Sequence, residues 1–218
     1  MNIQHMAETA KAAAIRLAAT DGAAKDKALA LIAAALRENR SELMAANQRD
    51  LDKAQSEHLS APLLKRLKFD ESKILETRQG LESLRRLPDP VGKTLCATEL
   101  DRGLELYKVS CPIGVVGVIF ESRPDALVQI SSLCLKSGNA VLLKGGREAA
   151  HTNSALADLI STAAKQADIP DGWIGLMESR SDVQELLGLD HVIDLIIPRG
   201  SRSRFNQRAR SAITPLIM

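Results

Sequence analysis

The spacing of apolar side chains divides the chain into a helical first part and a second part in which strands and helices alternate. Residues 3–86 are rich in Ala, Leu, Lys, Arg and Glu and almost free of Gly and Pro, a composition typical of helices. One helix is expected after Asp21, which suits an N-cap, because apolar residues then recur on one helical face. Ser60, with Pro62 in the first turn, and Asp70 mark two further helix starts.

Beyond residue 93 the pattern changes to short apolar runs separated by turns. Residues 94–109 predict a hairpin around the Asp-Arg-Gly turn at 101–103. The runs at 114–120 and 140–143 are continuous, as expected of strands buried on both faces. With strands at 173–177 and 192–197, and helices at 124–136, 148–166 and 181–187, four strands alternate with three helices. This order predicts a parallel sheet with right-handed crossovers, whose ligands bind beyond the carboxyl ends of its strands.

The composition supports a folded globular protein and disfavours two classes of partner. The 218 residues are 45% hydrophobic and 26% charged, which is enough apolar material for a core. Aromatic residues make up only 2%, so stacking platforms for single-stranded nucleic acid are not expected. The longest uncharged apolar run, residues 111–120, is well short of the roughly 20 residues of a membrane-spanning helix.

The net charge of +2 conceals an asymmetry along the chain. Residues 202–218 contain no acidic residue, so residues 1–201 carry −2 and the basic side chains of the tail supply the excess: Arg202, Arg204, Arg208 and Arg210. Association with nucleic acid through this tail is one alternative, but the slightly acidic remainder of the chain disfavours it.

The cysteines and histidines indicate a reducing cytoplasm and no metal site. Cys96, Cys111 and Cys134 are odd in number, form no CxxC pair and follow no secretory signal. For each of them, packing is a simpler explanation than catalysis. The four histidines are scattered without metal-ligand spacing.

The loops that follow the predicted strands are the places where a ligand is expected. Lys144 ends the second strand, two glycines follow it, and Arg147 adds a positive charge at a helix N-terminus, an arrangement that suits phosphate. The alternative is a tight glycine turn beside a solvated lysine. The GxGxxG fingerprint is absent, since Gly114 and Gly117 are spaced GxxG and lie inside a predicted strand rather than after it. No Walker A loop is present either.

One segment carries a family resemblance. Residues 111–153, CPIGVVGVIFESRPDALVQISSLCLKSGNAVLLKGGREAAHTN, closely resemble the gamma-glutamyl phosphate reductases, or glutamate-5-semialdehyde dehydrogenases, of the aldehyde dehydrogenase superfamily. The similarity runs from about residue 7 to residue 201, through LPDPVGK at 87–93 and DLIIPRGS at 194–201. It implies an α/β fold, with a helical N-terminal region and a variant Rossmann parallel sheet of the aldehyde dehydrogenase type, here truncated. The expected parts are a helical region (1–93), a hairpin (94–110), an NADP-binding α/β domain (111–201) and an unmatched basic tail (202–218).

The resemblance also implies a reaction, a cofactor and site residues. The reaction is the reduction of L-glutamyl 5-phosphate by NADPH to L-glutamate 5-semialdehyde in proline biosynthesis. By resemblance, the cofactor-binding residues are Ile119, Phe120, Glu121 and Ser122 beside the nicotinamide, Lys144 at the adenosine ribose, and Gly200 with Ser201 near the pyrophosphate. From charge alone, Arg147 is expected to receive the 2′-phosphate of NADP and Arg123 to bind the anionic substrate. An oxyanion role is not transferred to Glu121, because an ionised carboxylate cannot stabilise an oxyanion.

The resemblance ends at Ser201, before the segment that carries the nucleophilic cysteine in the family. No residue of this chain is therefore assigned a catalytic role, and the chain is expected to be inactive alone. The alternative is a non-catalytic fragment that binds a nucleotide or associates with full-length subunits.

Overall fold

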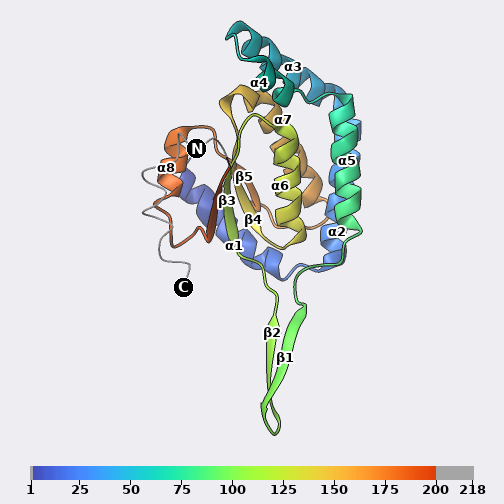
Figure 1. Ribbon diagram of the computed structural model, residues 1–218, viewed down its shortest axis with the longest axis vertical. Helices are drawn as coiled ribbons and strands as arrows, with labels where there is room; N and C mark the ends of the chain where they lie inside the picture. Colours follow the sequence, from blue (N-terminus) through green and yellow to red (C-terminus); the bar gives the residue numbers. More distant parts are fainter. Residues whose placement is uncertain (1, 200–218) are drawn as a thin grey trace.

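The computed structural model describes residues 2–199, and the first part of the chain is helical as the sequence predicts (Figure 1). Asp21 and Asp70 cap two helices, since each carboxylate accepts a hydrogen bond from a backbone amide in the first turn. Ser60 precedes a third helix with a proline in its first turn. The helices are α1 (Ile3–Ala18), α2 (Gly22–Glu38), α3 (Arg40–Ser56), α4 (Ala61–Leu67) and α5 (Glu71–Arg85).

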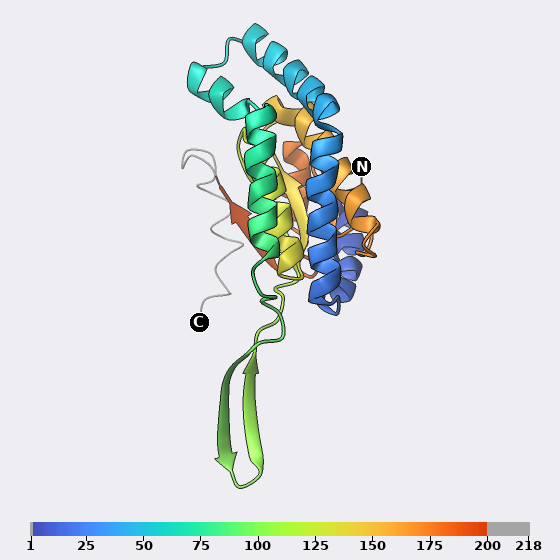
Figure 2. The same ribbon diagram turned by 90° about the vertical axis from the view of Figure 1, so that its right-hand side faces the viewer.

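The predicted hairpin is confirmed and extends away from the rest of the protein. Strands β1 (Thr94–Asp101) and β2 (Leu104–Val109) pair antiparallel, and Gly103 in the turn has a φ of +78°. Every residue of both strands is exposed, and Figure 2 shows the ribbon projecting beyond the helices. A two-stranded ribbon of this kind has no core of its own and is marginally stable in water.

The remaining strands form the predicted parallel sheet. Strands β3 (Val115–Ile119), β4 (Ala140–Lys144), β5 (Ile174–Leu176) and β6 (Leu195–Pro198) lie in the order β5-β4-β3-β6, with all pairs parallel. The strands β3 and β4 are almost wholly buried. The chain runs from β3 outward to β5 and then returns to place β6 on the other side of β3, so the strand order reverses beside β3.

Helices cover both faces of this sheet (Figure 1). On one face, α6 (Pro124–Lys136) and α7 (Ala150–Lys165) pack together, with α2 and α5 in a layer outside them. On the other face, α1 packs against the strands and contacts α8 (Arg180–Leu186). A short 3-10 turn, η1 (Arg147–Ala149), precedes α7. The α/β fold class predicted from the sequence is therefore confirmed.

The core joins the helical first part to the sheet. One cluster of buried apolar residues extends from Ile3 in α1 to Ile193 just before β6, and it consists mainly of Ala, Leu, Ile and Val. Trp173, the one tryptophan of the chain, is 1% exposed and accepts a hydrogen bond at its carbonyl from the Val141 amide, at 2.7 Å. Within residues 2–199, no helix is long and apolar enough to cross a membrane.

The last strand begins later than the sequence predicts. Val192 and Ile193 are buried, but their amides donate to the carbonyl of Leu189 in a turn rather than to a neighbouring strand. Pairing with β3 begins only at Asp194, whose amide donates to the Val115 carbonyl, directly before β6 starts at Leu195. An apolar β-branched run indicates burial, but it does not show where the backbone starts to pair.

Candidate functional site

The carboxyl ends of the central strands bring together the loops that the sequence analysis singled out. The amide of Phe120 donates to the carbonyl of Lys144 at 2.9 Å, and the amide of Arg199 donates to the carbonyl of Ile119 at 2.7 Å. The loops after β3, β4 and β6 are thus adjacent at the place where the strand order reverses. In open α/β sheets this is the usual position of a ligand crevice.

The loop after β3 contains both buried and exposed predicted residues. Phe120 is 4% and Ser122 is 1% exposed, whereas the Glu121 side chain is half exposed, with its carboxylate 4.0 Å from the guanidinium of Arg66. Arg123 forms an ion pair with Asp125 at 2.7 Å, and this pair raises the pKa of the guanidinium. The residue predicted to meet the substrate is therefore bound to a carboxylate of the protein.

The start of α6 offers little to an anion. Its first residue, Pro124, has no N–H group, and the carboxylate of Asp125 lies in its first turn, where it complements the positive end of the helix dipole. A phosphate at this helix end would meet a negative charge already in place.

The loop after β4 is more crowded than its two glycines suggest. A β-carbon on Gly145 would lie 2.2 Å from Nδ2 of Asn153, and one on Gly146 would lie 2.2 Å from Oε1 of Glu148. Side chains of the protein therefore occupy the space beside each glycine where a β-carbon would stand. Lys144 is 9% exposed, and its Nζ donates to the carbonyl of Gly145 at 2.5 Å.

The N-terminus of the helix after β4 is capped by a residue from α3. Asp50, 1% exposed, accepts hydrogen bonds from the amides of His151 at 3.1 Å and Thr152 at 2.8 Å, and from the hydroxyl of Thr152 at 2.6 Å. These first-turn amides, where a phosphate was predicted, instead serve a carboxylate of the protein. Arg147 precedes them in η1 and is exposed. Sequence reasoning missed Asp50, since nothing near it along the chain indicates a partner about 100 residues away.

A contact between the first two loops also escaped the sequence analysis. The hydroxyl of Ser122, after β3, donates to the carboxylate of Glu148, after β4. We call this contact the Ser122–Glu148 clasp. The only signal in the sequence is that Glu148 directly follows the predicted site residue Arg147.

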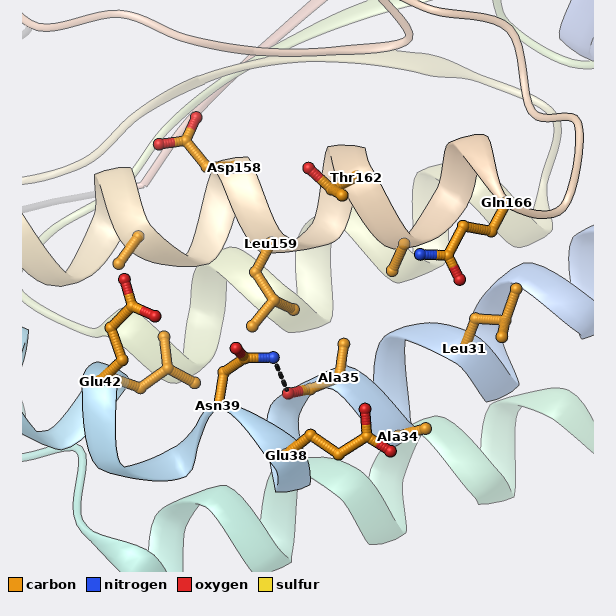
Figure 3. A pocket seen from close by; sticks show the side chains of 13 residues that line it. Leu31, Ala34, Ala35, Glu38, Asn39, Glu42, Asp158, Leu159, Thr162 and Gln166 are labelled. Atoms are coloured by element: carbon orange, nitrogen blue, oxygen red, sulfur yellow. Dashed lines mark hydrogen bonds between the residues drawn. The ribbon is translucent and has the colours of Figure 1, made fainter.

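A groove of about 440 Å³ lies elsewhere, between α2, α3 and α7 (Figure 3). Leu31, Ala35 and Leu159 supply apolar side chains to it. Glu38, Glu42 and Asp158 make its lining acidic. None of the predicted site residues lines this groove, so the candidate site remains at the strand ends.

Comparison with known proteins decides the family. The model of the aldehyde dehydrogenase family matches residues 1–214. The chain belongs to this family. It is 60% identical over 201 residues to gamma-glutamyl phosphate reductase of Acetivibrio thermocellus, covering 92% of this chain and 47% of the relative. The corresponding protein of Pelotomaculum thermopropionicum is 59% identical, with 92% and 46% covered.

Solved structures agree with the family assignment. The crystal structure of gamma-glutamyl phosphate reductase from Thermotoga maritima matches with a TM-score of 0.89 and 34% identity, covering 93% of this chain and 49% of that one. The Saccharomyces cerevisiae enzyme gives a TM-score of 0.87 and 39% identity, with 93% and 52% covered. The chain thus has the fold of this family, and it spans about half the length of the curated relatives it matches.

The aldehyde dehydrogenase family implies a nicotinamide cofactor, and the described strand ends fit one. A dinucleotide needs positive charge for its phosphates and polar partners for its ribose hydroxyls. Lys144 and Arg147 supply the charge after β4. Asn153 is 2% exposed, and its Oδ1 has no hydrogen-bond partner among the described residues, beside the Gly145 backbone. Gly200 and Ser201, the remaining predicted cofactor residues, lie outside the described part of the chain.

The cysteines of this family member differ in accessibility. Cys96 and Cys111 are exposed free thiols, whereas burial raises the pKa of Cys134 to about 12 and keeps it protonated at neutral pH. Among residues 2–199, no group of three His, Cys, Asp or Glu side chains could hold a metal ion.

Proposed function

We propose that this chain forms the cofactor-binding half of an oxidoreductase that reduces L-glutamyl 5-phosphate to L-glutamate 5-semialdehyde with NADPH, in the biosynthesis of proline. The observation that carries this proposal is the similarity to gamma-glutamyl phosphate reductases, which covers 92% of the chain at up to 60% identity. A cytoplasmic location is consistent with the free thiols of Cys96, Cys111 and Cys134.

The cofactor lies, in this proposal, across the carboxyl ends of β3, β4 and β6. The backbone from Ile119 through Phe120 and Glu121 to Ser122 runs beside the nicotinamide half. Lys144 contacts the adenosine ribose, Arg147 attracts the 2′-phosphate, and Gly200 with Ser201 receives the pyrophosphate. The adjacency of these loops supports the arrangement, since backbone hydrogen bonds join Phe120 to Lys144 and Arg199 to Ile119.

Arg123 is proposed to bind the carboxylate or phosphate of the substrate. In the structure its guanidinium is held by Asp125, so substrate binding exchanges one anionic partner for another or adds a second. An Arg123→Ala variant of this chain should weaken the binding of glutamyl phosphate at least tenfold while leaving NADPH affinity within twofold. Unchanged affinity for glutamyl phosphate would remove this assignment.

Hydride transfer is the chemistry that the bound cofactor supplies. Reduction of an acyl phosphate in this family requires a cysteine thiolate to displace the phosphate first. None of the three cysteines here is assigned that role, and the half-buried Cys134, whose pKa is raised to about 12, is protonated at neutral pH. Residues 1–218 by themselves are therefore proposed to bind the cofactor without turning it over.

Two measurements on the purified chain test this function. Isothermal titration with NADPH should give saturable binding, and incubation with NADPH and glutamyl phosphate should give no steady loss of absorbance at 340 nm. Absence of any binding would overturn the cofactor-binding role. Steady oxidation would overturn the claim that this chain lacks turnover.

Association with full-length subunits is the second candidate, and the hairpin favours it. Leu100, Leu104, Leu106 and Tyr107 are each more than half exposed on a ribbon with no packing partner in the described chain. Exposed apolar surface of this kind commonly marks an interface. Mixing the tagged chain with an untagged full-length relative, followed by light scattering after gel filtration, should reveal a joint complex. Separate elution of the two proteins at all concentrations would exclude this function.

A further inference from the structure

Arg66 of α4 brings a second guanidinium to the loop after β3, the loop that carries Arg123. Its Nη1 lies 4.0 Å from Oε2 of Glu121, and both side chains are about half exposed. Two opposite charges from distant parts of the chain therefore lie side by side at the carboxyl end of the sheet. No sequence motif drew attention to Arg66, because only the fold brings α4 to this loop.

The backbone that carries Arg66 is firmly held. Leu67, the next residue, is 1% exposed and packs in a small apolar cluster that also contains Ala54 of α3 and Ala149 of η1. The carbonyl of Leu67 accepts a hydrogen bond from Nδ2 of Asn47 at 2.9 Å. The end of α4 is therefore fixed beside the loops after β3 and β4, while the guanidinium itself remains in contact with solvent.

The ion pair of Arg66 is looser than that of its neighbour Lys68, which has the carboxylate of Asp70 at 2.7 Å. The 4.0 Å between Arg66 and Glu121 exceeds the length of a direct N–H···O hydrogen bond, about 2.7–3.2 Å. A guanidinium has five N–H donors. Arg66 can therefore bind a carboxylate of a ligand while it stays beside Glu121.

Glu121 lies where a substrate is expected. In the proposed cofactor site its backbone runs beside the nicotinamide, and hydride transfer requires the substrate to lie against that ring. Its side chain is half exposed, whereas Phe120 and Ser122 on either side of it are buried. The carboxylate therefore faces solvent, with the guanidinium of Arg66 beside it.

We propose that Arg66 and Glu121 together bind the amino-acid end of the substrate, Arg66 its α-carboxylate and Glu121 its α-ammonium group. The inference rests on the proposed function. The two groups of the substrate are attached to one carbon atom, so adjacent side chains of opposite charge can contact both at once. Arg123 then serves the phosphate at the other end of the substrate. This role uses Glu121 in its ionised form, the form that cannot stabilise an oxyanion.

Three small probes test the proposal on the purified chain saturated with NADPH. L-Glutamate carries both groups, glutarate lacks the ammonium group, and 4-aminobutyrate lacks the α-carboxylate. By ligand-observed NMR titration, L-glutamate should bind about tenfold more tightly than either analogue. Arg66→Gln should remove the advantage over 4-aminobutyrate, and Arg66→Lys should keep part of it, because the charge remains without the planar fork. Glu121→Gln should remove the advantage over glutarate.

Arg37→Gln and Glu38→Gln are the matched controls, since they alter an exposed ion pair of 3.8 Å in α2. They should leave all three affinities within twofold, and circular dichroism confirms that each variant is folded. A chain that binds NADPH but does not prefer L-glutamate over its analogues overturns this inference alone. The same holds if the preference survives Arg66→Gln and Glu121→Gln. Failure of the unsubstituted chain to bind NADPH overturns the proposed function and this inference with it.

Discussion

Asp50 of α3 caps α7 through the backbone amide of Thr152, at 2.8 Å, although 102 positions separate the two residues in the sequence. The hydroxyl of the same threonine donates to Asp50 and is also 3.2 Å from the side-chain amide of Asn47. Asn47 in turn binds the backbone of Leu67 and Phe69. This buried network ties the helical first part of the chain to the helix beside the candidate cofactor site.

Replacing Asp50 should destabilise the protein strongly. Asp50→Ala would leave first-turn amides of α7 and the Thr152 hydroxyl without their acceptor, a loss of about 2–4 kcal/mol in the free energy of unfolding. Asp52→Ala, on the exposed side of the same helix, should change it by less than about 0.5 kcal/mol. Urea unfolding followed by circular dichroism measures both. Equal effects of the two substitutions would contradict the capping role.

The two types of glycine environment predict opposite effects of the same substitution. Gly145→Ala places a methyl group 2.2 Å from the buried Asn153 amide and 3.2 Å from Phe120, so it should lower stability by about 1–3 kcal/mol and weaken NADPH binding. Gly80→Ala, in α5 with no atom within 4 Å of the new carbon, should stabilise by about 0.5–1 kcal/mol. Thermal unfolding of both variants shows whether each substitution lowers or raises the stability. A stabilised Gly145→Ala protein would show that Asn153 moves aside without cost.

The ionised carboxylate of Asp89 should account for part of the stability that the fold loses in acid. Burial by itself raises the pKa of Asp89, but hydrogen bonds from Lys25 and the Val91 amide, with the charges of Lys25 and Lys136, lower it below its ordinary value of 3.8. The contribution of the ionised Asp89 carboxylate to the free energy of unfolding is therefore fully present above pH 3.8. It is lost as the pH falls through the lower pKa of the folded state.

Asp89→Asn tests this contribution because it leaves Lys25, 1% exposed, without its ion-pair partner. At pH 7 the variant should be less stable by about 2–4 kcal/mol, and the difference should shrink as the pH falls below 3.8. Asp190→Asn is the control, because the Asp190 side chain is 96% exposed, and it should follow the unsubstituted protein at every pH. If the difference in stability between Asp89→Asn and the unsubstituted protein stays the same at every pH, the result would argue against the ionic contribution.

The three thiols should react at very different rates. Burial raises the pKa of Cys134 to about 12, whereas Cys96 and Cys111 are exposed. Iodoacetamide at pH 8 should therefore modify Cys96 and Cys111 in the native protein and modify Cys134 only after unfolding in urea. Peptide mass spectrometry identifies the labelled sites. Rapid labelling of Cys134 in the native state would contradict its burial.

Features set by neighbours in the sequence could be predicted well. The caps at Asp21 and Asp70 depend on the next three residues of the chain. The helix predicted over residues 124–136 begins and ends where the structure places α6, because Pro124 starts it and Gly138 follows its end.

Features set by distant neighbours could not be predicted. The turn after Lys144 gave no sign that the side chain of Asn153, from α7, fills the space beside Gly145. The acceptor for the α7 amides comes from α3, about 100 positions earlier in the chain. Long-range packing decides each of these points, and the local sequence pattern carries no information about it.

The single tryptophan gives this protein a built-in optical probe. Trp173 is buried next to β4, so its emission should be blue-shifted in the folded state and move to longer wavelength when the sheet opens. Reduced nicotinamides absorb in the range where a buried indole emits. Energy transfer from Trp173 would therefore report an occupied strand edge without any added label, and the same signal would follow unfolding of the core around it.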